Sequence, residues 1–365
     1  MVNPPQKTIR SVQYLRAFAA LAVVYYHIAI LDFGKALGLS ETGDWGVDVF
    51  FVISGFIMGT IVVQDSSAFL TRRIMRIVPL YWVATLGWAG LALLFPAQTK
   101  STVVDLPGIL KSLFFIPYEL PLRIGPILGL GWTLNYEMFF YLLIAFSLWV
   151  FKDAKKSLLI ASGLLVALVV SGVFYSSAFF PLTFYQAPIL LEFVAGIWLA
   201  FAYRHFGEAG QESQSGKLAR VIFGGVALVA AFIWLTQQSL FATDGFFSQR
   251  AVFYGIPAFL MVLGALAVEP VLKPGWFDTL CLELGAGSYA IYLFHAFTVG
   301  LLGPSFFGTK SLAENYGLSL LIMIATMVFT AFLGIAINKW VDTPLQRKLK
   351  QFIYRPGKLS SFHNK

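Results

Sequence analysis

The chain has 365 residues, of which 58% are hydrophobic and only 12% carry a charge, and its mean hydropathy is +0.77. Soluble domains carry about 25% charged residues, so this composition excludes a soluble globular protein and indicates a polytopic membrane protein. The formal net charge is +8, but the charged residues fall in the loops and the tail, so we attribute the excess to membrane orientation and expect no nucleic-acid partner.

Long apolar runs follow one another along the chain, and a helix needs roughly 20 apolar residues to cross a bilayer. We therefore expect an all-α integral membrane protein with about ten transmembrane helices. The runs cover residues 12–31, 47–63, 78–95, 132–151, 157–173, 183–203, 219–237, 250–268, 287–303 and 318–339. The first run is too long for a cleaved signal peptide, so it is expected to stay as a span.

Two other segments are expected to differ from the spans. An apolar run near 107–117 is too short to cross a bilayer and is expected to be an interfacial or re-entrant segment. Beyond the last run, Thr343 followed by Pro344 is typical of the start of a new, short helix. We therefore divide the chain into a transmembrane domain of residues 1–345 and a basic cytoplasmic tail, 346–365, in contact with membrane lipids.

Most of the 26 Lys and Arg residues fall in every second loop and in the tail. Cytoplasmic loops of membrane proteins carry an excess of these residues, so both termini are expected in the cytoplasm. The single cysteine, Cys281, predicts no disulfide within the chain, and no Cys and His cluster has the spacing of a metal site. We therefore expect no metal.

The first run carries Arg16 and His27, although an ionisable group inside a bilayer costs about 2.5–3.5 kcal/mol even on mild insertion scales. Eleven positions return a helix to within about 20° of the same direction, about 16 Å further along its axis, so the two share one face. The small residues Ala20 and Val23 lie between them on that face. Alone, Arg16 could reach the lipid headgroups and His27 could be structural; together they indicate a shared role.

Two carboxylates are candidates to assist His27. Asp48 stands at the outer end of the second run and Glu137 about one and a half turns into the fourth, so all three are expected in the outer half of the membrane. A carboxylate beside an imidazole raises its basicity and fixes its tautomer, which makes a general base for a hydroxyl. Spacing leaves open which carboxylate pairs with His27, and Asp48 could instead cap its helix. Gly55 and Gly59 predict a closely approaching helix.

Further polar groups lie just before the third run and within the ninth. Arg73 and Arg76 share a face at the inner mouth of the third run. Arginines there are often only anchors, but guanidinium groups also bind phosphate well. The ninth run carries four polar side chains: Ser288, Tyr289, Tyr292 and His295. They could line a substrate channel, or the tyrosines could form an aromatic belt and the histidine could be structural.

One arrangement explains cations at the inner face and an imidazole further out. A phosphorylated acyl donor would be held from the cytoplasm by Arg16, Arg73 and Arg76. Its thin arm would run along the small-residue strip, so that the acyl group reaches His27 while the acceptor hydroxyl arrives from outside. Tyr136 and the polar residues of the ninth run are candidates to line this channel.

Five motifs in this order resemble the membrane acyltransferase family 3, which includes polysaccharide and Nod-factor O-acetyltransferases, over roughly residues 9–345. They are R-x10-H (Arg16 to His27), GVDVFFVISGF (Gly46 to Phe56), R-x-x-R (Arg73 to Arg76), W-x-L-x-x-E-x-x-F-Y (Trp132 to Tyr141) and SYAIYLFH (Ser288 to His295). Members often end the last span with Glu-x-Pro. Here Asp342 and Pro344 take those places, which we treat as a conservative change.

The resemblance implies ten spans in a bacterial inner membrane and acetyl-CoA, or another acyl-CoA, as co-substrate without a bound cofactor. It implies O-acylation of a hydroxyl on a cell-surface or exported glycan or on its lipid-linked precursor. Arg16 and His27 would be essential, with Arg73 and Arg76 near the donor. His27, Glu137 and Asp48 are then the candidate catalytic residues.

Two mechanisms and one alternative function stay open. His27 could deprotonate the acceptor for direct attack on the thioester, or it could carry the acyl group briefly as an acyl-imidazole. A non-enzymatic transporter or flippase of a glycan or glycolipid would also have apolar helices with a few buried charges. Many transporters contain internal repeats, and the sequence shows none, which favours the enzyme.

Overall fold

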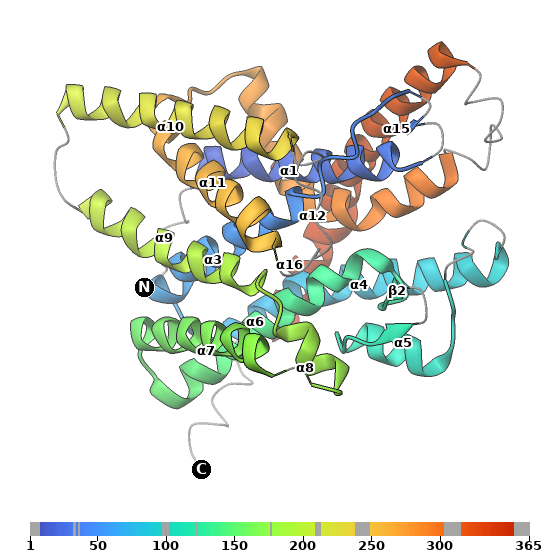
Figure 1. The fold of residues 1–365 in the computed structure, drawn as a ribbon, viewed down its shortest axis with the longest axis horizontal. Helices are drawn as coiled ribbons and strands as arrows, with labels where there is room; N and C mark the ends of the chain where they lie inside the picture. Colours follow the sequence, from blue (N-terminus) through green and yellow to red (C-terminus); the bar gives the residue numbers. More distant parts are fainter. Residues whose placement is uncertain are drawn as a thin grey trace.

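The structure, a computed structural model, describes residues 8–353 apart from the segments 32–33, 36, 97–98, 100–101, 121–122, 176, 209–212, 238–248 and 303–314. The described residues form a helical bundle with one small hairpin (Figure 1). The α-helices are α1 (Arg10–Ala29), α3 (Gly46–Gln64), α4 (Phe69–Leu94), α5 (Leu106–Leu113), α6 (Trp132–Phe151), α7 (Ala154–Phe174), α8 (Phe180–Tyr185), α9 (Leu190–Glu208), α10 (Gln214–Thr236), α11 (Ile256–Val268), α12 (Trp276–Leu302), α15 (Tyr316–Ile337) and α16 (Thr343–Ile353).

Shorter elements connect these helices. The antiparallel strands β1 (Glu119–Leu120) and β2 (Arg123–Ile124) form the hairpin before α6. Two 3-10 turns, η1 (Gly129–Gly131) and η4 (Glu269–Val271), and two π-helical turns, η3 (Ala251–Gly255) and η5 (Asn338–Asp342), extend neighbouring helices. π-helical turns are rare and often lie at functional sites, and residues at both of these turns enter the site described below.

Nine helical segments of the described chain are long and apolar enough to cross a membrane, so the protein is an all-α, multi-pass membrane protein. The predicted runs from the second onward each coincide with one of them. The first run forms α1, a helix of 20 residues, but it is not among the nine. Its polar residues, Gln13, Arg16 and His27, lower its hydropathy below that of the other helices.

The helices that carry the polar residues occupy the middle of the bundle. α1, α3 and α12 lie at the centre, and α7, α10 and α15 lie towards its outside (Figure 1). In α3, 72% of the most apolar window is buried, against 22% in α10. α1 packs along α12, and α12 packs in turn against α15. Many large apolar side chains of the outer helices are exposed, such as Trp149, Val173 and Phe174, as expected of a surface that faces lipid.

Glycines bring α3 and α9 into direct contact. A Cβ atom added at Gly55 would clash with the backbone oxygen of Phe193, and one at Gly196 with the backbone oxygen of Val52. At Gly59 an added Cβ would lie 2.7 Å from the Cβ of Ala200. The close helix contact that Gly55 and Gly59 predict is therefore confirmed, and α9 is the helix that approaches α3.

The predictions for the short segment near 107–117 and for the helix after the last run have different outcomes. The segment near 107–117 contains α5, a helix of eight residues, and its interfacial or re-entrant placement remains a prediction. The predicted short helix beyond the last run is α16, which begins at Thr343. Thr343 does not cap a separate helix, however, because its own backbone is helical, and α15 continues through the π-helical turn η5 directly into α16. Residues 354–365 of the predicted tail lie outside the described residues.

Candidate active site

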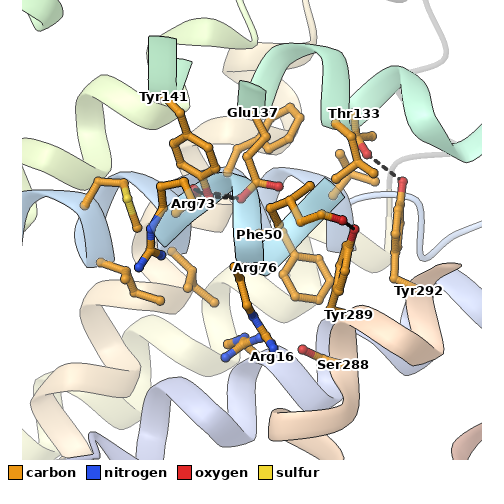
Figure 2. Close-up of a pocket in the computed structure, with 18 residues that line it drawn as sticks. Arg16, Phe50, Arg73, Arg76, Thr133, Glu137, Tyr141, Ser288, Tyr289 and Tyr292 are labelled. Carbon is orange, nitrogen blue, oxygen red and sulfur yellow. Dashed lines mark hydrogen bonds between the residues drawn. The ribbon is translucent and has the colours of Figure 1, made fainter. Parts of the chain in front are cut away.

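A cavity of about 220 Å³ lies between α1, α3, α4, α6 and α12 (Figure 2). We call it the arginine cavity, because the three predicted donor-binding arginines meet in it. α1 supplies Arg16, and α4 supplies Arg73 and Arg76. The other lining residues with polar side chains are Ser54, Thr133, Glu137, Tyr141, Ser288, Tyr289 and Tyr292.

The arginines of this cavity are only partly neutralised. Nη1 of Arg76 lies 2.8 Å from Oδ2 of Asp342, a buried carboxylate at the end of η5, and its guanidinium lies over the ring of Tyr289. The charges of Arg16 and Arg76 are close enough to act on one another (Figure 2). Nε of Arg73 is buried without a hydrogen-bond partner among the described residues. Two neighbouring guanidinium groups and an unsatisfied third suit an anion with several acceptor oxygens, such as a phosphate.

Glu137 projects from α6 into the same cavity (Figure 2). Its Oε1 accepts hydrogen bonds from the hydroxyl of Tyr141 and, at 3.2 Å, from that of Ser54. The charges of Arg73 and Arg16 act on its carboxylate. Glu137 therefore belongs with the arginines, and the prediction that it pairs with His27 finds no support in the hydrogen bonds of the described residues.

A second cavity, of about 450 Å³, contains His27, and we call it the histidine cavity. It is lined by aliphatic and aromatic side chains and a few polar ones. Val47 and Tyr292 line both cavities, so the two cavities adjoin at these residues. The Tyr292 hydroxyl is held in place by Thr133 Oγ1, at 2.9 Å, and by the backbone oxygen of Leu130, at 3.0 Å.

α1 runs past both cavities and places Arg16 in the first and His27 in the second. This is the relation that their spacing predicts. The strip between them is not an open groove, however. Ala20 is fully buried in a cluster with Ile291 of α12, because α1 and α12 pack closely there. The two cavities approach each other beside α1, at Val47 and Tyr292.

The ring of His27 has two neighbours. Its Nδ1 lies 2.9 Å from the backbone oxygen of Val23 and 3.3 Å from Nε2 of His295. His295 is fully buried, and its own Nδ1 lies 2.7 Å from the backbone oxygen of Tyr292. A carbonyl oxygen only accepts, so each Nδ1 carries a proton. Nε2 of His27 is then the basic nitrogen.

The predicted pairing of Asp48 with His27 is not what the structure shows. Asp48 is fully buried and accepts hydrogen bonds from Arg250, from Nε at 2.9 Å and from Nη2 at 2.6 Å. Arg250 directly precedes the π-helical turn η3 and also contacts Asp44. A buried guanidinium captures the carboxylate, since a buried charge needs a partner of opposite sign.

Two further predictions concerned residues near the channel. Tyr136 lines neither cavity; it is fully buried, donates to the backbone oxygen of Phe184 at 2.7 Å and stacks on the Phe184 ring, so its role is in packing. His295 also lies behind the cavity wall and not in it, in contact with His27. Ser288, Tyr289 and Tyr292 do line the arginine cavity, as predicted.

Sequence reasoning missed three charged residues of the site. Arg250 begins the predicted run 250–268, and only 2% of it is exposed. Asp44 lines the histidine cavity, and Asp342 pairs with Arg76. The Asp-x-Pro motif contained a signal for Asp342, because an acid in a largely apolar span needs a cation. Nothing in the local sequence signals the contact of Arg250 with Asp44 and Asp48, which lie over 200 positions away.

Comparison with known proteins identifies the family of the chain. A family described as an acyltransferase domain matches residues 9–339. The chain is 35% identical over 319 residues to the exopolysaccharide production protein ExoZ of Rhizobium meliloti, an alignment that covers 84% of this chain and 90% of that protein. It is 26% identical to the O-acetyltransferase OatA of Staphylococcus aureus and 25% identical to the peptidoglycan O-acetyltransferase OatA of Listeria monocytogenes. These alignments cover 95% and 94% of the chain but only 59% and 56% of those two proteins. No solved structure matches the chain.

Proposed function

Because the chain belongs to the acyltransferase family that matches residues 9–339, we propose that it transfers an acetyl group from acetyl-CoA to a hydroxyl of a glycan. The acceptor would be a cell-surface or exported glycan or its lipid-linked precursor, as suggested by the similarity to the exopolysaccharide production protein ExoZ. Acetyl-CoA would enter from the cytoplasm, and the protein would lie in the inner membrane of a bacterium.

A single observation carries this proposal: two cavities meet at Val47 and Tyr292, one with three arginines and the other with a histidine whose Nε2 is basic. An acyltransferase needs a place for the charged donor and a base for the acceptor hydroxyl, near each other. The two cavities supply these separately, and α1 connects them through Arg16 and His27.

The arginine cavity is the proposed donor site. Arg73, Arg76 and Arg16 would bind the phosphates of acetyl-CoA, and its slender arm would point towards the wall at Tyr292. Glu137, which is held by Tyr141 and Ser54, would balance part of the arginine charge and orient these side chains. In this proposal Glu137 is a donor-site residue, and Asp48 acts only through Arg250.

His27 is the proposed general base of the transfer. Its Nε2 takes the proton from the acceptor hydroxyl while the oxygen attacks the thioester carbonyl carbon. The tetrahedral intermediate then collapses, the carbon–sulfur bond breaks, and the CoA thiolate takes the proton from His27. In the other mechanism Nε2 attacks the thioester carbonyl carbon, the carbon–sulfur bond breaks, and the CoA thiolate leaves, with the acyl group bound to the imidazole as an acyl-imidazole. The acceptor hydroxyl then attacks this acyl carbon, the carbon–nitrogen bond breaks, and the hydroxyl proton goes to the thiolate. Both routes need an unprotonated Nε2.

The test uses purified protein in nanodiscs with acetyl-CoA that is radiolabelled in the acetyl group and an added glycan acceptor. We expect the wild type to consume the thioester and His27→Ala to bind acetyl-CoA but not consume it. His205→Ala is the matched control, because His205 is an exposed histidine of α9 that lines neither cavity. Acid-labile label on the wild-type protein would favour the acyl-imidazole. A wild type that neither binds nor consumes acyl-CoA would contradict the proposal and favour a glycan transporter.

A further inference from the structure

Among the described residues that line the histidine cavity, Asp44 is the one carboxylate, and Arg250 holds it in place. Nη1 of Arg250 donates to Oδ2 of Asp44 at 3.2 Å, and Nη2 donates to the backbone oxygen of Asp44 at 3.2 Å. Both the side chain and the backbone of Asp44 are therefore fixed. The side-chain hydrogen bond uses Oδ2, which leaves Oδ1 as an acceptor for a bound molecule.

Arg250 does not turn this cavity into an anion site. Its guanidinium is buried between the carboxylates of Asp44 and Asp48, and its faces lie over the rings of Tyr254, at 4.8 Å, and Trp132, at 6.0 Å. Two carboxylates therefore surround one guanidinium, and the buried carboxyl group of Glu192 also acts on it, so no excess of positive charge faces the cavity. His27 adds no positive charge, because its unprotonated form is the base.

The rest of the wall is largely apolar, and several of its side chains are aromatic. Tyr26, Trp88 and Trp132 line the histidine cavity, whose volume of about 450 Å³ lies within the usual range for small-molecule sites, about 300–1,000 Å³. The face of an aromatic ring is electron-rich, so it attracts the weakly positive C–H bonds on one side of a sugar ring. Aromatic faces combined with a fixed carboxylate suit a molecule with C–H bonds and hydroxyl donors.

We propose that the histidine cavity binds an uncharged sugar ring, one hydroxyl of which donates to Asp44 Oδ1 while another reaches His27. This inference rests on the proposed function, since the sugar is the acetyl acceptor. Asp44 is then a specificity-determining residue, and Arg250 is a positioning residue that acts through Asp44. A sugar with a carboxylate, such as a uronic acid, is disfavoured because its charge has the same sign as that of Asp44.

The experiment compares two probes that differ only at C6, the p-nitrophenyl glycosides of glucose, which has a hydroxymethyl group there, and of glucuronic acid, which has a carboxylate. Their binding to the full-length protein in nanodiscs is followed by tryptophan fluorescence, because Trp88 and Trp132 line the cavity, and acetylation from labelled acetyl-CoA is measured separately. We expect the wild type to bind the neutral glycoside at least about tenfold more tightly. Binding is read without the reaction, so failure of this inference is distinct from failure of the proposed transferase activity.

The variants separate a role in recognition from a role in folding. Asp44→Asn keeps an acceptor oxygen but removes the charge, and we expect it to reduce the discrimination between the two glycosides at least severalfold. Asp44→Ala should raise the KM for the neutral glycoside about tenfold without changing the KM for acetyl-CoA. Glu41→Gln is the matched control, because Glu41 lies in the same loop but pairs with Lys35 on the surface. Equal binding of both glycosides, tighter binding of the glucuronide, no saturable binding of the glucoside, or unchanged discrimination in Asp44→Asn would overturn the inference.

Discussion

Nδ1 of His27 and Nε2 of His295 lie 3.3 Å apart across the interface between α1 and α12. Each Nδ1 faces a backbone oxygen and so carries its proton, which leaves Nε2 of His295 as an acceptor directed at the N–H of His27. When His27 takes a proton at Nε2, its ring becomes positive, and His295 faces that charge with a lone pair. His295 thus takes the place that the sequence had suggested for a carboxylate.

Replacement of His295 should slow the reaction without weakening donor binding. His295→Phe keeps a ring but removes the acceptor, and we expect kcat to fall about 100-fold, within the usual range for loss of acid–base assistance. His295→Gln offers an acceptor oxygen at a similar reach and should recover much of the loss. The measurement is kcat and KM for acetyl-CoA in nanodiscs. A purely structural role would instead lower the melting temperature and kcat equally in both variants.

Arg73 should contribute to donor affinity, whereas its neighbour Arg72 should not. Arg73 lines the arginine cavity with its Nε unsatisfied, while Arg72 pairs with Asp65 outside the cavity at 2.8 Å. Loss of a charge-assisted hydrogen bond costs about 1.5–3 kcal/mol, so Arg73→Gln should raise the Kd for acetyl-CoA about tenfold or more. Arg72→Gln is the matched control and should bind as the wild type does. Equal effects of the two changes would contradict a donor site at Arg73.

The Arg76–Asp342 ion pair should hold the donor site in shape. Asp342→Asn removes the partner of Arg76, and we expect weaker acetyl-CoA binding because the freed guanidinium no longer has a fixed position. Asp342→Glu restores the charge and should lie close to the wild type. A double-mutant cycle with Arg76→Gln measures the coupling, which for residues in contact is about 0.5–3 kcal/mol. Additive effects would show that the pair does not act as a unit.

The contact between α3 and α9 should tolerate no side chain at Gly55. Gly55→Ala places a Cβ against the backbone of Phe193, and overpacking of this kind typically costs about 1–3 kcal/mol. Gly163→Ala in α7 is the control, since nothing lies within 4 Å of its added Cβ. Thermal unfolding in nanodiscs should show a lower midpoint for the first variant and an unchanged or higher one for the second. An unchanged midpoint for Gly55→Ala would mean that the helices can separate at little cost.

The orientation of the chain also needs a direct test. The distribution of Lys and Arg predicts that both termini lie in the cytoplasm. A fluorescent protein that matures only in the cytoplasm, fused to the C-terminus, should therefore be bright, and an alkaline phosphatase fusion at the same place should be inactive. The opposite pair of results would place the arginine cavity towards the outer side and remove the proposed route for acetyl-CoA.

Much of the architecture could be predicted from the sequence because hydrophobic length is a local property. A run such as 47–63 must become a helix in a bilayer, since every backbone group has to be satisfied within the segment, and α3 covers that run. The glycine pattern at Gly55 and Gly59 predicted a close helix partner for the same local reason. The spacing of Arg16 and His27 could be converted into a shared face because helix geometry is regular.

Only the tertiary structure decided which charged groups meet. The sequence placed Asp48, Glu137 and His27 at one depth and predicted a pair among them, but depth alone does not determine the direction of a side chain around the bundle axis. Arg250 captures Asp48, and Glu137 joins the arginines. His27 is left with His295, 268 positions away. Partner choice in a bundle depends on helix rotation and on buried charges finding opposite charges, and neither is encoded in any single segment.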